Sequence, residues 1–262
     1  MSKIIRILSW NVNGIRAVHK KGFLDWLANE QPDILCIQET KASTGQLSED
    51  LLTPSGYTSY WSSAVRKGYS GVAIYTKIPA LNVTTSLGIP EFDQEGRFLR
   101  ADFDEFILMN VYFPNGKMGT ERLKFKLDFY DVFLDYIERL RQQKRSIIFV
   151  GDVNTAHQEI DLARPKENSK VSGFLPVERQ WIDTTVAKGY LDTFRKLNGD
   201  LVKYSWWDMK SGARNRNIGW RIDYIFVSAD LEERLRQAFI LTDVQGSDHC
   251  PVGIDLETQT GF

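Results

Sequence analysis

An apolar run passes directly into polar residues in the stretch Ser146-Ile147-Ile148-Phe149-Val150-Gly151-Asp152-Val153-Asn154. The run is mostly β-branched or aromatic and ends at a glycine, which predicts a short buried strand. A Gly-Asp pair after a strand is more often a turn than a binding site. The stretch alone therefore predicts a strand with a polar end, and its function depends on what other strand ends bring to the same place.

Similar stretches recur on both sides of this strand, which is predicted over residues 146–150. Further strands are predicted over residues 4–10, 33–38, 71–76, 98–103, 106–113, 224–227 and 252–256, and helices over residues 22–29, 120–142 and 176–188. Hairpin-like pairs mix with strand–helix–strand units, and no linker rich in Pro, Gly or Ser divides the chain. The pattern predicts one α/β domain over residues 1–262, with packed mixed sheets and outer helices.

The composition is that of a soluble globular protein, with 42% hydrophobic and 26% charged residues among 262. No run approaches the roughly 20 apolar residues that span a bilayer, and the N-terminus enters a strand pattern without a signal peptide. We therefore expect a cytoplasmic protein that does not bind membranes. Cys36 and Cys250 lack the spacing of a zinc site, and we expect no disulfide between them.

The net charge of −1 gives no indication of nucleic acid binding. Affinity for nucleic acid depends on local Lys and Arg density rather than on the total charge, so such binding is not excluded. Basic clusters occur in residues 16–21, 66–67, 139–145 and 210–221. Taken alone, each cluster is best interpreted as a solvated face.

Polar residues gather where the predicted strands begin or end. These residues are Asn11, Asn13, Glu39, Tyr112, Asn115, Asp152, Asn154, Asp223, Asp248 and His249. Ends of adjacent strands can converge on one rim of a fold, where functional residues are often found. Each residue alone has an ordinary structural explanation, but their joint occurrence predicts a shared site.

The atoms of this group favour a particular chemistry. Four carboxylates (Glu39, Asp152, Asp223 and Asp248) join the amide oxygens of Asn11 and Asn154. Hard oxygen ligands select Mg²⁺ or Mn²⁺ over zinc. The carboxylates would repel one another unless a cation or a protonated histidine such as His249 lay among them. This combination suits phosphoryl transfer, in which charge grows on phosphate oxygens.

The sequence resembles the exonuclease III family of abasic-site endonucleases, within the endonuclease/exonuclease/phosphatase superfamily. The likeness runs from Trp10-Asn11-Val12-Asn13-Gly14 to Gly246-Ser247-Asp248-His249-Cys250-Pro251. It also includes Gln38-Glu39-Thr40-Lys41, Gly151-Asp152-Val153-Asn154, Asp93-Gln94-Glu95-Gly96-Arg97 and Gly219-Trp220-Arg221-Ile222-Asp223-Tyr224. The segments 93–97 and 219–224 are the ones specific to abasic-site enzymes. The fold that the resemblance implies is a four-layer α/β sandwich of two packed mixed β-sheets flanked by helices.

The resemblance also implies roles for individual residues. The implied metal ligands, for Mg²⁺ with Mn²⁺ able to substitute, are Asn11, Glu39, Asp152, Asn154, Asp248 and His249. The implied catalytic residues are Tyr112, Asp152, Asn154, Asp223 and His249, with Asp152 acting on the attacking water and Asp223 orienting His249. The implied substrate-binding residues are Asn115 at the phosphate, Trp206, Trp220 and Ile222 around a base-less sugar, and Lys210, Arg214, Arg216 and Arg221 at backbone phosphates. Trp207 is instead expected in the core.

The implied activity is hydrolysis of duplex DNA on the 5′ side of an abasic site, leaving a 3′-hydroxyl. Some 3′–5′ exonuclease or 3′-phosphodiesterase activity would accompany it, and the substrates would be double-stranded DNA with abasic sites or blocked 3′ ends. No obligate protein partner is evident, and we expect a monomer.

Two alternatives remain beside this activity. A hydrolase of lipid phosphoesters is disfavoured by the segments 93–97 and 219–224. A regulatory homologue that binds nucleic acid without cutting it is disfavoured by the full set of catalytic residue types.

The loop Lys170-Val171-Ser172-Gly173-Phe174 follows the catalytic turn in sequence. We hypothesise that this loop lies against DNA, so that a bulky residue at Gly173 would hinder a flipped abasic sugar within continuous duplex. The alternative of equal weight is that Gly173 only supplies a positive φ for a turn.

Overall fold

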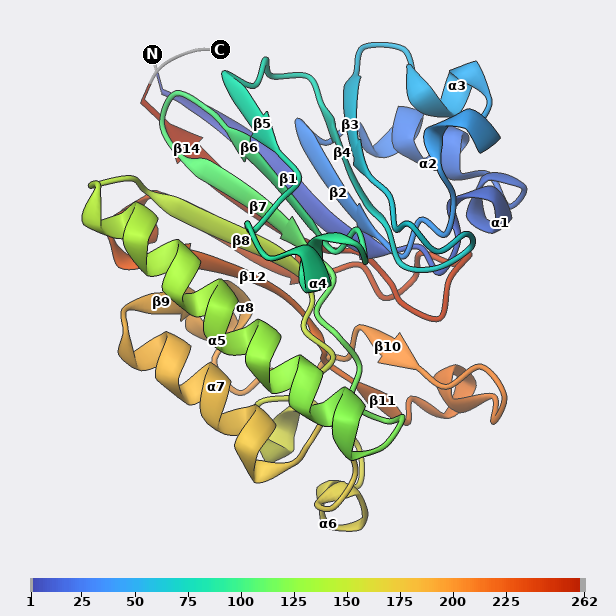
Figure 1. Cartoon of the computed structure of the whole chain (residues 1–262), viewed down its shortest axis with the longest axis vertical. Coiled ribbons are helices and arrows are strands. Elements are labelled where there is room, and N and C mark those ends of the chain that lie inside the picture. The colour runs from blue at the N-terminus through green and yellow to red at the C-terminus, as the bar shows by residue number, and fades with distance from the viewer. Residues whose placement is uncertain (1, 260–262) are drawn as a thin grey trace.

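Two six-stranded mixed sheets pack face to face in the computed structural model, which describes residues 2–259 (Figure 1). One apolar core lies between the sheets, and two others lie between a sheet and its outer helices. The predicted four-layer sandwich is therefore confirmed. Within the described part of the chain, no helix has both the length and the apolar character needed to cross a membrane.

The first sheet has parallel strands at its centre. Its order is β13 (Leu235–Ile240), β14 (Val252–Thr258), β1 (Lys3–Asn11), β2 (Ile34–Gln38), β4 (Val72–Thr76) and β3 (Thr58–Ser62). β1 and β2 run parallel, with Asn11 opposite Gln38, whereas the other pairs are antiparallel. The ends of β1 and β2 therefore lie at the same edge.

The second sheet repeats this arrangement. Its order is β5 (Asn82–Thr84), β6 (Phe98–Asp102), β7 (Ile107–Val111), β8 (Ile147–Asp152), β12 (Asp223–Ser228) and β9 (Tyr190–Asp192). β7 and β8 run parallel, and β12 returns antiparallel to β8 with Asp223 opposite Asp152. A two-stranded ribbon of β10 (Trp206–Trp207) and β11 (Gly219–Trp220) projects beyond the sheets (Figure 1).

Helices cover the outer face of each sheet (Figure 1). On the first sheet these are α1 (Ile15–His19), α2 (Phe23–Glu30) and α3 (Glu49–Leu52); on the second they are α5 (Thr120–Gln142) and α7 (Pro176–Ala187). Phe129, Phe133 and Ile137 recur at helical spacing in α5 and are fully buried, so the helix is held by one apolar face. Shorter helices, α4 (Pro90–Asp93), α6 (Pro165–Asn168) and α8 (Thr193–Asn198), and the 3-10 turns η1 (Thr44–Gln46), η2 (Glu159–Asp161), η3 (Ala213–Arg216) and η4 (Ala229–Arg234) lie in the connections.

All eight predicted strands and all three predicted helices are confirmed, with ends that differ by no more than two residues. The predicted hairpin is also confirmed, because β6 and β7 pair antiparallel. The edge strands β3, β5, β9 and β13 and the short helices were not predicted, because they are brief or alternate with charged residues.

A polar bridge joins the two sheets inside their apolar interface. Asn110 of β7 is fully buried, and its Nδ2 donates to the carbonyls of Ile37 (3.0 Å) and Ala73 (2.8 Å) in the opposite sheet. Its Oδ1 accepts a hydrogen bond of 2.7 Å from Nε2 of Gln38, which also donates to Ser9 Oγ at 2.9 Å. Apolar contacts are non-directional, whereas these hydrogen bonds fix the position of one sheet along the other.

We expect Asn110→Ala to lower the free energy of unfolding by about 2–4 kcal/mol, since it leaves buried polar groups without partners. Chemical denaturation measures this change. Asn82→Ala, on the exposed part of edge strand β5, is the matched control and should change stability by less than about 0.5 kcal/mol. Equal stability of the two variants would contradict a bridging role for Asn110.

Candidate active site

The ends of five strands from both sheets converge on one rim. Asn11 ends β1, Glu39 follows β2 and Asp152 ends β8. Asp223 begins β12, and residues 248–249 lie just before β14. Because β12 pairs with β8 in a register that places Asp223 opposite Asp152, two carboxylates meet within one sheet. The structure thus brings together side chains that are far apart in sequence.

The chain turns sharply as it leaves these strands. Asn13, Glu39, Lys41 and Asn154 all have positive φ, at 48°, 53°, 52° and 55°. Residues other than glycine rarely adopt this conformation, and such strain is often found at functional sites. The turns direct polar side chains back over the strand ends.

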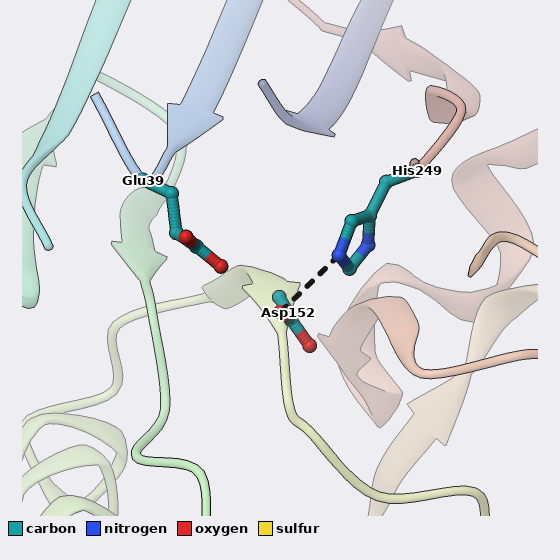
Figure 2. Close-up of side chains that lie close together, drawn as sticks. All are labelled: Glu39, Asp152 and His249. Carbon is teal, nitrogen blue, oxygen red and sulfur yellow. Dashed lines mark ion pairs between the residues drawn. The ribbon is translucent and has the colours of Figure 1, made fainter. Parts of the chain in front are cut away.

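Glu39, Asp152 and His249 form the centre of the site (Figure 2). Each offers one ligand atom, and these atoms all lie within 4.8 Å of one another. The buried amide of Asn11 bridges the two carboxylates, because its Nδ2 donates to Glu39 Oε1 and to Asp152 Oδ2, both at 2.9 Å. Asn11 comes from the first sheet and Asp152 from the second, so the amide also ties the sheets together at the rim.

His249 is fixed by a second carboxylate. Its Nδ1 donates to Asp223 Oδ2 at 2.9 Å, and Ser205 Oγ donates to the same oxygen at 2.6 Å. Its Nε2 faces Asp152 Oδ2 at 3.9 Å (Figure 2). Burial would lower the pKa of His249, but the charge and hydrogen bond of Asp223 outweigh it and raise this pKa to about 10. Asp223 therefore orients the imidazole and favours its positively charged form.

The two central carboxylates have opposite pKa shifts. Burial raises the pKa of Asp152 to about 7, with Asp223 and Glu39 adding to the increase and His249 opposing it. Burial also acts to raise the pKa of Glu39, but the ammonium of Lys41 and the amide of Asn11 more than compensate, so this pKa is lowered. Of the two carboxylates, Asp152 is thus the one whose charged form an added cation would stabilise more.

Three further predicted residues, Asn154, Asn115 and Tyr112, lie beside the centre and line the same cavity. Nδ2 of Asn154 donates to the carbonyl of Phe113 at 3.0 Å and to Asp152 Oδ2 at 3.3 Å, while its Oδ1 accepts from Asn115 Nδ2 at 3.0 Å. Tyr112 is half-buried, and burial followed by the charge of Glu39 holds the pKa of its hydroxyl well above the usual range.

Arg97 contacts both the ring and the main chain of Tyr112. This buried guanidinium lies 4.5 Å from the centre of the Tyr112 ring and donates to the Tyr112 carbonyl at 3.0 Å. Arg97 belongs to the segment 93–97 that the sequence singled out.

A cavity of about 260 Å³ contains the charged centre together with a few apolar side chains. Trp206, Trp220 and Ile222 line one side, and Glu39, Asp152 and His249 line the other. Phe174 and Leu162 pack behind the tryptophans. Asp248 lies at the junction, where its Oδ2 accepts from the Trp206 indole at 3.0 Å and its Oδ1 from Asn13 Nδ2 at 2.8 Å. Trp207 is buried, as predicted for a core residue.

The predicted basic residues of the 210–221 segment do not line this cavity. Arg221 is fully buried and paired with Asp161 (2.8 Å) and Asp192 (2.7 Å), so the prediction that it contacts phosphate was wrong. Arg214 donates to the main-chain carbonyls of Ser247, Thr242 and Val244, so hydrogen bonds within the protein occupy its guanidinium. Arg216 and Lys210 are exposed on the connection between β10 and β11.

Three further residues belong to the site but were not assigned from sequence. Lys41 Nζ pairs with Glu39 Oε2 at 2.9 Å and donates to Asn13. Lys117 lines the cavity with its ammonium 5.1 Å from the Trp206 ring, and Ser205 supports Asp223. Lys41 stands within a quoted motif and could have been identified there, whereas Asn13 was already among the residues predicted to share the site. Lys117 and Ser205 carry no local signal, because only the fold brings them to the site.

The donor set fits a divalent cation. The ligand atoms of the central group are two carboxylate oxygens and one imidazole nitrogen, and neither Cys36 nor Cys250 is part of this group. Asp152 retains an unfavourable negative charge that a cation would neutralise, as its raised pKa indicates. In the present orientation Asn11 and Asn154 direct amide nitrogens at the carboxylates, and Asp248 is engaged by Trp206 and Asn13 outside the central group.

Comparison with known proteins identifies the relatives of this chain. Residues 8–249 match the endonuclease/exonuclease/phosphatase family. The sequence is 46% identical to an exodeoxyribonuclease of Bacillus subtilis (strain 168), over 95% of this chain and 98% of that protein. It is 40% identical to a DNA-(apurinic or apyrimidinic site) endonuclease of Dictyostelium discoideum, over 97% of this chain and 71% of that one. An AP endonuclease structure from Archaeoglobus fulgidus superposes with a TM-score of 0.88 at 28% identity, covering 96% and 99% of the two chains.

The raised pKa of His249 predicts a pH-dependent contribution to stability. The folded state binds this proton more tightly than the unfolded state, so the contribution is full below pH 6.5 and is lost as pH rises through about 10. Asp223→Asn removes the main cause. In EDTA, the melting temperature of this variant should lie several degrees below that of the wild type near pH 6.5, and the gap should narrow toward pH 10. A gap independent of pH would contradict the assigned charge.

Proposed function

The chain belongs to the endonuclease/exonuclease/phosphatase family, and on this basis we propose that it is a DNA-repair endonuclease for abasic sites. It hydrolyses the phosphodiester on the 5′ side of the abasic sugar in duplex DNA and leaves a 3′-hydroxyl. It also removes blocking groups or nucleotides from 3′ ends. The relatives named as an exodeoxyribonuclease and as an apurinic or apyrimidinic site endonuclease support both activities.

One observation carries the proposal. The hydrolytic group of Glu39, Asp152 and His249 shares a single cavity of about 260 Å³ with the apolar side chains of Trp206, Trp220 and Ile222. A nucleotide that lacks its base exposes an apolar sugar face when it leaves the helix. Such a cavity accepts that face, while its size and aromatic walls exclude a sugar that still carries a base.

We assign the metal as Mg²⁺, with Mn²⁺ able to substitute. Glu39 would be its main ligand, with Asn11 and Asp248 close to the ion, and Asp152, Asn154 and His249 would contribute directly or through water. When bound, such a cation stabilises the charge that develops on phosphate oxygens.

The protein side chains then divide the remaining tasks. Asp152 positions the attacking water and accepts its proton, since it is the least stabilised carboxylate of the group. His249, held by Asp223, and Asn154 donate to the non-bridging oxygens. Asn115 and Tyr112 contact the same phosphate from the other side of the cavity. Water adds to phosphorus as Asp152 takes its proton, the bond from phosphorus to the 3′-oxygen breaks, and that oxygen takes a proton from solvent to become the 3′-hydroxyl.

Duplex DNA would reach the site along the adjoining basic surface. A depression of about 730 Å³ shares Asn13 and Lys41 with the site and is also lined by Arg16 and Lys20. Cations at this place attract phosphates although the net charge is −1. We propose that one monomer suffices.

The experiment that tests the function compares two duplexes, one with a natural abasic site and one with its tetrahydrofuran analogue. Hydrolysis cuts both in Mg²⁺, leaves a 3′-hydroxyl and a 5′-deoxyribose phosphate, and stops in EDTA. A lyase needs the sugar aldehyde, so it would spare the analogue and be trapped by borohydride. Trapping without a 3′-hydroxyl product would exclude the proposal, and binding without cleavage would favour the non-catalytic alternative.

We expect Asp152→Asn to reduce kcat on the tetrahydrofuran duplex by about 10²-fold or more, because it removes the proposed proton acceptor. Glu39→Gln should instead raise the Mg²⁺ concentration needed for half-maximal rate, with little effect on DNA affinity. Steady-state kinetics over a Mg²⁺ series, with fluorescence anisotropy for binding, separates the two effects. Near wild-type kcat for Asp152→Asn would refute its assignment.

Gly173 tests the preference between abasic sites and 3′ ends. Its φ is +101°, and an added Cβ would lie 3.2 Å from the Trp220 ring and 3.3 Å from the Asn154 carbonyl, so both hypotheses retain support. Gly173→Ala introduces the backbone strain and the tight Cβ contacts without further bulk, and it should reduce stability. Gly173→His adds bulk, and we expect it to reduce internal abasic cleavage at least about tenfold more than it reduces removal of a 3′-phosphate at a nick. A parallel loss of both activities, or a loss equal to that of Gly173→Ala, would leave only the turn explanation.

A further inference from the structure

A fully buried ion pair is bonded to two segments that line the cavity, and it has no part in the chemistry described above. Lys126 of α5 and Glu178 of α7 are both 0% exposed, and Nζ lies 2.7 Å from Oε1. Burying two charges carries a large desolvation cost, and pairs of this kind are often no more stable than apolar replacements. Their presence beside a functional cavity therefore calls for a role other than stability.

The ammonium of Lys126 is directed at the turn that carries the catalytic residues. Besides Glu178, it donates to the main-chain carbonyl of Asn154 at 2.8 Å and to Thr155 Oγ1 at 2.7 Å. An ammonium has three donors, so all of them are used. Two of the three hold residues 154–155, which follow β8 and Asp152.

The carboxylate of Glu178 is directed at the loop that walls the cavity. Its Oε1 accepts from Ser172 Oγ at 2.8 Å, and its Oε2 accepts from the main-chain N–H of Gly173 at 2.6 Å and of Leu175 at 3.0 Å. Ser172 and Gly173 line the cavity. The carbonyl of Gly173 in turn accepts from the N–H of Ala156 at 2.8 Å.

Helix capping accounts for only part of this arrangement. Glu178 is the third residue of α7, and its bond to the N–H of Leu175 is that of a capping box. A capping box needs neither a lysine nor the contacts to Ser172 and Gly173. Lys126 lies 52 residues from Glu178 in sequence, and through Lys126 the carboxylate of Glu178 connects the loop to the turn after β8.

We propose that Lys126 and Glu178 are positioning residues, which set the distance between the loop of residues 170–175 and the turn that carries Asp152 and Asn154. This spacing determines how well the cavity encloses an abasic sugar that is still joined to DNA on both sides. A 3′ end at a nick is less constrained and depends less on the wall. The inference rests on the proposed function for its effect on activity, but not for the anchoring itself.

The test compares three variants. Glu178→Gln keeps the shape of the side chain and weakens its bonds, but leaves Lys126 charged and buried. Lys126→Met with Glu178→Gln removes that charge too, so it recovers stability, while the side-chain link between loop and turn stays broken and only the main-chain bond from Ala156 to Gly173 remains. Asp255→Asn is the control, because it breaks the ion pair between the buried carboxylate of Asp255 and the partly exposed Arg6 (2.9 Å), which involves neither the loop nor the turn.

The activity measured is the ratio of kcat/KM for internal abasic cleavage to kcat/KM for removal of a 3′-phosphate at a nick. Both values come from one preparation, so the ratio does not depend on how much of the enzyme is folded. We expect this ratio to fall by about fivefold or more in Glu178→Gln and in the double variant. It should stay within about twofold of wild type in Asp255→Asn.

Amide hydrogen exchange of residues 170–175 in the free protein gives a measurement that does not need DNA. The amides of Gly173 and Leu175 should exchange about tenfold faster or more in the double variant, and should be unchanged in Asp255→Asn. Recovery of the wild-type ratio together with the melting temperature in the double variant, or unchanged exchange, would overturn the proposal. A wild-type protein that cuts neither substrate would instead refute the proposed function.

Discussion

The hydrogen bonds between Gln38 and Asn110 fix the register of the two sheets, and the site depends on that register. Apolar side chains alone would allow one sheet to slide along the other, because their attraction has no direction. Gln38 directly precedes Glu39, while Asn110 lies opposite Val150 in the parallel pair of β7 and β8. A slip of one residue, about 3.3 Å, would exceed the tolerance of the 2.9 Å bonds from Asn11 to Glu39 and Asp152.

The register in turn forces like charges together. Glu39, Asp152 and Asp223 approach one another from two sheets, and His249 and Lys41 partly compensate their charge. Burial, together with the charges of Asp223 and Glu39, still raises the pKa of Asp152. A site of this kind sacrifices stability in the free protein and gains affinity for a cation and for a reaction in which negative charge is redistributed. The polar bridge between the sheets prevents the strain from being relieved by a shift of the strands.

The sequence was sufficient to predict the central strands, because they are buried on both faces and read as continuous apolar runs. It also predicted the residues at the strand ends, since polar side chains directly after such runs are unusual. It failed where the partner is distant in sequence. Arg221 belonged to an apparent basic cluster, yet Asp161 and Asp192, 60 and 29 residues away, neutralise it in the core. Charge density along a chain cannot distinguish a solvated cation from one that a remote carboxylate has buried.

Arg221 is one of several buried polar groups that join separate segments of this fold. Asn110, Arg221 and the pair of Lys126 with Glu178 are all buried, and each joins segments that apolar packing would leave free to adjust. Well-packed apolar side chains in their place could give equal or higher stability. They would not specify distances to within a few tenths of an ångström, because a hydrophobic core tolerates repacking. Asn154 and Trp220 are each adjacent to such a group or bonded to it, so the geometry of the site is a direct product of the polar part of the core.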